Sequence, residues 1–199
     1  FFSFGYLFIA FLLFSSMKLP VPFYPQTSLL NCGPTALRMA LSFLHQDPGI
    51  QLLEKTTGIL HGKGITTIQL ATSAALLKFP TDFFSTHILF DESHMQMEFY
   101  KKYVPMNLEQ SKEWLQAALR AGVHVEERSV ELDELLKMVS LQSIPIVLLD
   151  WGVVVGNPQK GYQGHFVPVV GYDEKQVHVH NQGLNNPASF LPIPRDVFD

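Results

Sequence analysis

Apolar positions recur at helical spacing through the first two thirds of the chain. After Asn31 they follow one another at steps of three and four residues: Leu37, Ala40, Leu41 and Leu44. Pro34 stands where an early helical position tolerates proline, and Asp47-Pro48-Gly49 is a stop signal. We therefore expect a helix that begins at Cys32. Similar spacing predicts helices over residues 50–57, 67–78, 92–103, 109–121 and 132–141.

Strand patterns are concentrated in the second half of the chain. Residues 123–128 alternate between polar and apolar, and residues 144–151 form an apolar run with the length of a buried strand. Residues 164–172 and 176–181 flank the polar turn at 173–175 and predict a hairpin. Helices that come first and strands that come later favour an α+β fold, with a helical half packed on an antiparallel sheet.

An apolar leader precedes this pattern. Residues 1–14 carry no charge, but a helix of that length reaches only about 21 Å, against a hydrocarbon core of roughly 30 Å. Three interpretations stay open for residues 1–16: a truncated membrane anchor or signal segment, a piece upstream of a start at Met17, or a helix packed on the body. The first favours a membrane-associated or exported bacterial protein, and a start at Met17 favours a cytoplasmic one.

Length and composition narrow the classes of protein. The chain has 199 residues, of which 47% are hydrophobic and 16% charged, so we expect residues 17–199 to form one folded domain. Residues 195–199 resemble the first turn of a helix cut short, which suggests that the C-terminus of this domain is incomplete. The formal charge of -4 and the lack of any basic run argue against nucleic acid as a partner. With a single cysteine, Cys32, the chain forms no internal disulfide and no thiolate cage for a metal.

Cys32 has the setting of a nucleophile. Unpaired amides and the positive end of the dipole at a helix start are expected to lower a thiol pKa. A thiolate that attacks an acyl carbon also needs a base, a residue that orients the base, and donors for the oxyanion. Gln26 on the extended entry segment is the candidate oxyanion donor, His165 the candidate base and Asn181 its candidate partner.

Strand parity brings the last two residues together. If residues 173–175 form a three-residue turn, Tyr172 faces Gln176 and His165 faces Gly183. Asn181 then lies two positions along on the face of His165, a diagonal of about 7–8 Å that two side chains can bridge. A turn that is longer or shorter by one residue would place them on opposite faces.

These residues resemble a known group of enzymes. The segment from Gln26 to Leu37, which contains Asn31-Cys32-Gly33-Pro34, and the segment Gly164-His165-Phe166 onward are similar to papain-like cysteine peptidases. They look closest to peptidase family 39-like proteins, relatives of the double-glycine leader peptidases. The resemblance implies a papain-like fold, no cofactor, and hydrolysis of a peptide or protein substrate through a thioester. It also implies that Cys32 is the nucleophile, His165 the base, Gln26 the oxyanion donor and Asn181 the orienting residue.

A weaker resemblance reaches the C-terminal third of the chain. Residues 144–150, the Gly164-His165-Phe166 strand and Asn186-Pro187-Ala188 are similar to a related papain-like family that carries the name guanylyl cyclase domain. We give it less weight, because nucleotide cyclisation calls for paired carboxylates and a phosphate cradle, which the sequence does not display. A papain-like acyltransferase and a catalytically silent binding module remain alternatives to the peptidase, and the oligomeric state stays open.

Two further features have ordinary structural interpretations. His178 and His180 share one strand face and could hold a metal, but without a third ligand an exposed strand face is the expected arrangement. Asp150 ends a buried strand, and a strand-end turn is favoured over a carboxylate in the cleft.

Overall fold

The computed structural model describes residues 16–59 and 62–199. All of the predicted leader except Ser16 lies outside these residues, and so does His61. Within the described part of the chain, no helix combines the length and the apolar character needed to cross a bilayer.

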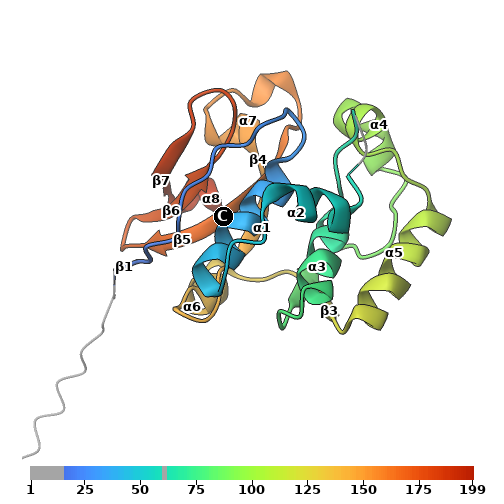
Figure 1. Ribbon diagram of the computed structural model, residues 1–199. Coiled ribbons are helices and arrows are strands. Elements are labelled where there is room, and N and C mark those ends of the chain that lie inside the picture. Colours follow the sequence, from blue (N-terminus) through green and yellow to red (C-terminus); the bar gives the residue numbers. More distant parts are fainter. Residues whose placement is uncertain (1–15, 60–61) are drawn as a thin grey trace, which may run out of the picture.

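An antiparallel sheet of five strands forms one side of the molecule (Figure 1). Its strand order is β1-β5-β6-β7, and β4 also pairs with β5. The strands are β1 (Met17–Lys18), β4 (Ile146–Asp150), β5 (Gly164–Tyr172), β6 (Gln176–Asn181) and β7 (Ala188–Pro194). The mixed α+β class and the antiparallel main sheet are confirmed, and β5 and β6 have the predicted bounds.

The hairpin between β5 and β6 differs from the predicted one. Tyr172 pairs with Val177 rather than Gln176, so the turn is one residue longer than expected. A register shift then follows, and Val169 lies opposite Val179. This bulge compensates for the longer turn, because carrying the second register along both strands places position 165 opposite position 183, as predicted.

The main helices begin where the sequence predicts. They are α1 (Cys32–Leu44), α2 (Ile50–Thr57), α3 (Thr67–Leu76), α5 (Leu108–Ala121) and α6 (Leu132–Met138). The start of α3 is fixed by a capping box between Thr66 and Gln69, and α5 ends at Gly122 in the left-handed conformation. The predicted helix over residues 92–103 is divided into a 3-10 turn, η1 (His94–Gln96), and α4 (Glu98–Tyr103).

The remaining elements are short. β2 (Asp82–Ser85) and β3 (His124–Glu127) form a separate two-stranded parallel sheet, so the antiparallel arrangement does not extend to the strand predicted at 123–128. The other short elements are α7 (Trp151–Val154), η2 (Pro158–Lys160) and α8 (Arg195–Phe198), the last of which was predicted as a first helical turn.

Helix α1 lies between the sheet and the helices α2 and α3 (Figure 1). Met39 belongs to the core cluster against the sheet, whereas Leu37 and Leu41 belong to the cluster formed with α2 and α3. Because both faces of α1 are covered, the position of its first residue is set by packing on two sides.

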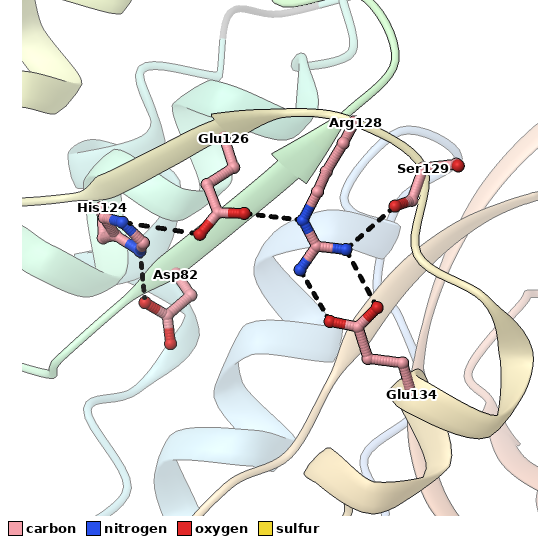
Figure 2. A network of polar contacts seen from close by, with 6 residues as sticks. All are labelled: Asp82, His124, Glu126, Arg128, Ser129 and Glu134. Carbon is pink, nitrogen blue, oxygen red and sulfur yellow. Dashed lines mark hydrogen bonds and ion pairs between the residues drawn. The ribbon is translucent and has the colours of Figure 1, made fainter.

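Arg128 joins the small sheet to α6 (Figure 2). Its guanidinium donates to both carboxylate oxygens of Glu134 at 2.9 and 2.6 Å, and to Glu126 at 2.6 Å. The same group lies 4.5 Å from the ring centre of Phe84. These contacts connect β2 and β3 with α6, which packs against the main sheet.

Candidate functional site

The loop before α1 is fixed by buried hydrogen bonds. The fully buried amide of Asn31 donates to Glu54 Oε1 and to Thr27 Oγ1, both at 2.9 Å, and accepts from Ser28 N at 3.1 Å. Its side chain therefore does not cap the helix. Within the described residues, the amides of Cys32 and Gly33 donate to no main-chain acceptor.

The thiol of Cys32 is half-buried, and burial sets its chemistry. Burial raises the pKa of Cys32, while the backbone N–H groups of Phe166, Gly33 and Cys32 itself act in the opposite direction without reversing the shift. The expectation that the helix start lowers this pKa is therefore wrong for the structure as it stands. The thiol is protonated at neutral pH.

His165 and Asn181 are brought together as predicted. Nε2 of His165 lies 3.1 Å from Oδ1 of Asn181. The orientation of that amide follows from two main-chain partners: its nitrogen donates to Asn186 O at 2.9 Å, and its oxygen accepts from Gly183 N at 3.0 Å. Because an amide oxygen only accepts, Nε2 of His165 must carry the hydrogen.

The remaining nitrogen of His165 is left as an acceptor. Burial lowers the pKa of His165 to about 4, and its hydrogen bond to Asn181 offsets this only in part. The imidazole is therefore neutral at pH 7, with its lone pair on Nδ1. The ring of Trp151 packs edge-on against the imidazole, with centroids 4.7 Å apart. Sequence reasoning had placed Trp151 only at the end of a strand.

Cys32 and His165 line one groove without a direct hydrogen bond. The groove has a volume of about 1150 Å³ and also contains Gln26 and Gly183 in its lining. The N–H of Phe166, the residue after His165, lies close enough to the sulfur to affect the pKa of Cys32. Helix α1 therefore begins directly beside the strand that carries the histidine. The predicted nucleophile and base thus lie on two elements that pack against each other, α1 and β5.

Gln26 reaches the groove with its donor group turned away. Its side chain is buried, and Nε2 donates to Ser28 O at 2.8 Å. Its Oε1 is buried without a hydrogen-bond partner. Gln26 therefore lies where the sequence predicts, but an oxyanion role requires its amide to exchange the bond to Ser28 for one to the substrate.

One wall of the groove is aromatic. Tyr100 and Phe99 of α4 pack on Tyr162, stacked at 5.5 Å and edge-on at 5.3 Å between centroids. Phe99 also lies against Gly164, where an added Cβ would be 3.1 Å from its ring. This packing holds α4 against the loop that leads into His165.

His180 is not exposed, which corrects the expected open strand face. Its side chain is fully buried, Nε2 donates to Val21 O at 2.9 Å, and Nδ1 accepts from Phe190 N at 3.0 Å. His178 instead bonds to Asp173 Oδ2 at 3.1 Å. Asp150 accepts from Gly152 N and Gln163 N, which agrees with the favoured strand-end turn.

Sequence reasoning did not single out Gln182. This residue directly follows Asn181, is fully buried, and donates through Nε2 to the carbonyls of Cys32 and Phe166. No signal in a single sequence distinguishes such a residue from an ordinary turn glutamine, because its role depends on which carbonyls the fold places around it.

The chain matches the model of a known protein family. Residues 21–191 match a family model described as guanylylate cyclase, so the resemblance to which we gave less weight is the one confirmed. The resemblance to peptidase family 39 has no support from these comparisons. Neither the comparison with curated proteins nor that with solved structures found a match. Among the described residues, no three His, Cys, Asp or Glu side chains are grouped so that they could hold a metal.

Proposed function

The chain belongs to the guanylylate cyclase family, and from this premise we propose that this member is a cysteine-dependent hydrolase of peptide bonds with a papain-like site. The observation that carries the proposal is the buried His165–Asn181 pair, which leaves Nδ1 as an unprotonated acceptor on a residue that lines the same groove as Cys32. A helix that begins with the thiol and packs on the strand bearing the base is also the arrangement of a papain-like fold.

The proposed reaction begins from the neutral pair. Nδ1 of His165 takes the proton of Cys32 as the sulfur bonds to the carbonyl carbon of the substrate, and the carbonyl electrons move to the oxygen. The C–N bond then breaks, the leaving amine receives that proton, and a thioester remains. Water adds to the thioester with His165 again as base, which releases the carboxylic acid and restores the thiol.

The helix start supplies donors for the oxyanion. The amides of Cys32 and Gly33 have no main-chain acceptor, and preorganised donors of this kind stabilise the negative oxygen that forms in the transition state. Gln26 could add a third donor after its amide leaves Ser28. No cofactor enters this scheme, since thiol, imidazole and water provide every group that reacts.

A peptide-library cleavage screen tests the proposal. We expect the wild-type chain to release defined products and Cys32→Ala and His165→Ala to lose at least about 10²-fold in kcat/KM, the low end of what a general base contributes. Ser42→Ala, which changes a side chain of α1 away from the thiol, is the matched control. Turnover that survives Cys32→Ala, or no turnover with any peptide, would overturn the proposal.

The family description favours a second candidate, cyclisation of a guanine nucleotide. This reaction needs no thiol, so it predicts turnover of GTP with a divalent cation that is unchanged in Cys32→Ala. The same samples therefore separate the two candidates. Products that carry an added amine or thiol acceptor would instead identify an acyltransferase.

A further inference from the structure

Gln182 connects the three parts of the proposed site. Its side-chain nitrogen donates to Cys32 O at 2.9 Å and to Phe166 O, and its main-chain oxygen accepts from Gln26 N at 2.9 Å. It also stands directly after Asn181. One fully buried residue thus contacts the first residue of α1, the residue that follows His165, and the candidate oxyanion donor.

The position of Gln182 follows from the bulged hairpin. The register that pairs Val169 with Val179 places position 166 opposite position 182 when it is carried three residues further along both strands. Strand β6 ends at Asn181, so Gln182 lies just beyond the last residue of the strand. Its side-chain amide donates to the carbonyl of Phe166 on β5. The second hydrogen of the amide is then free to bond to the carbonyl of Cys32.

The hydrogen bonds of Gln182 matter because no direct bond between the thiol and the imidazole fixes the distance between them. Cys32 and His165 share no hydrogen bond, so the distance from Sγ to Nδ1 depends on how the start of α1 sits against β5. Both acceptors of Gln182 are main-chain carbonyls, and they belong to these two elements. The orientation of the amide is also fixed, since only its nitrogen can face two carbonyls, and Oε1 is left buried without a partner.

We propose that Gln182 is a positioning residue that sets the alignment of Cys32 with His165. The inference rests on the proposed function, and it extends that function to a residue that touches neither substrate nor reacting atoms. A misplacement of about 1 Å at a reacting centre can cost on the order of 10²-fold in rate. Loss of Gln182 should therefore lower kcat by about 10- to 100-fold and change KM by less than about threefold.

Alkylation of the single cysteine gives a readout that does not need a substrate. We would measure the rate of iodoacetamide labelling at pH 7 to 9 in wild type, His165→Ala, Gln182→Met and the double variant. Gln176→Met, the same exchange at the start of β6, is the matched control. In wild type, His165→Ala should slow labelling at least about tenfold, because the base no longer assists the thiol.

The coupling between the two substitutions decides the outcome. If Gln182 positions the pair, His165→Ala should have little further effect on the labelling rate in the Gln182→Met background. If the two residues act independently, the fold-changes of the single variants should multiply in the double variant. If peptide hydrolysis is absent but this coupling is present, the proposed function fails and the positioning role stands. If the two effects multiply, or if Gln182→Met labels and turns over like Gln176→Met, the positioning role is wrong.

A second variant distinguishes a loss of positioning from a folding defect. Gln182→Glu keeps the shape of the side chain but, once ionised, places a carboxylate against two carbonyls, so above the raised pKa of this buried carboxyl it should reproduce the loss of coupling. Below the raised pKa of a buried carboxyl it regains one donor, and labelling coupled to His165 should partly return. If neither variant folds by circular dichroism, Gln182 is a residue required for folding, and the positioning proposal is overturned.

Discussion

The imidazole of His165 is kept neutral by its surroundings, and this gives Asn181 a testable role. In Asn181→Asp, a carboxylate accepts the hydrogen of Nε2 and stabilises the imidazolium, so the pKa of His165 should rise from about 4 toward its ordinary value. The base must be neutral to act, so the acid limb of kcat/KM should move to higher pH. A pH profile from 3.5 to 9 measures the shift.

The same substitution should also lower stability. The second carboxylate oxygen would face Asn186 O where the amide nitrogen now donates, which replaces a hydrogen bond with a repulsive contact. We expect a loss of about 1–3 kcal/mol in the free energy of unfolding. Asn185→Asp, a neighbouring change on the exposed loop, is the control. An acid limb that stays in place in Asn181→Asp would show that His165 is not the titrating base.

Single residues differed in how far the sequence could predict them. Cys32 at a helix start and His165 beside Asn181 followed from spacing and strand parity. The parity argument reached the right pair although its turn was one residue too short, because a bulge that no sequence signal marks restored the register. The direction of the Cys32 pKa shift was wrong, since it depends on how closely β5 covers the sulfur.

At the scale of elements, patterns with strong local signals were predicted well and strands that depend on neighbours were missed. Periodicity gave the start of α1 and the bounds of α2 and α5 within a residue, whereas α1 ends at Leu44, before the predicted stop signal at residues 47–49. Strand β7 contains Pro192 and Pro194, which argue against a strand in isolation. The structure resolves this by placing β7 at the end of the sheet order, where prolines are tolerated.

Helix α4 is an element whose position depends on a few aromatic contacts. Phe99→Ala removes the ring that packs on Tyr162 and Gly164. Since Phe99 is only half-buried, we expect a cost of about 1–3 kcal/mol, below that of a fully buried ring. The segment 91–107 should open locally, and limited proteolysis should cut it faster than in wild type.

Phe43→Ala provides the comparison for this prediction. Phe43 is also half-buried, but it packs against the cluster under the main sheet. Its truncation should lower the melting temperature without exposing residues 91–107. Equal protection of that segment in Phe99→Ala and wild type would mean that α4 is held by other contacts.

At the scale of the whole molecule, two neutral histidines are buried at the sheet. His165 faces the groove, and His180 joins the entry segment at Val21 to the edge strand at Phe190. Protonation of His180 would break the hydrogen bond from Phe190 N to Nδ1, and protonation of His165 would place a charge in a buried position. The fold therefore depends on a protonation state as well as on apolar packing, which the scattered histidines of the sequence did not indicate.

This arrangement predicts a loss of stability in mild acid. Burial lowers the pKa of both histidines in the folded chain, to about 4 for His165, whereas unfolded histidine titrates near 6.5. Between these values the unfolded chain binds more protons than the folded chain. The contribution of the histidines to the free energy of unfolding is therefore fully present above about pH 6.5 and decreases as the pH drops toward 4. The shift of His165 alone corresponds to on the order of 3 kcal/mol.

Urea unfolding at pH 7.5, 6.5, 5.5 and 4.5 measures this loss. Asp47, with a pKa lowered to about 2 beside Arg38, loses its contribution only below its ordinary value near 4, outside the window of the histidines. In His180→Gln, the side chain can still accept from Phe190 N and donate to Val21 O but cannot take up a proton, so stability should fall less steeply. His45→Gln, at an exposed histidine, is the matched control. If His180→Gln and wild type lose stability with the same slope, the buried ring is not the group that links folding to pH.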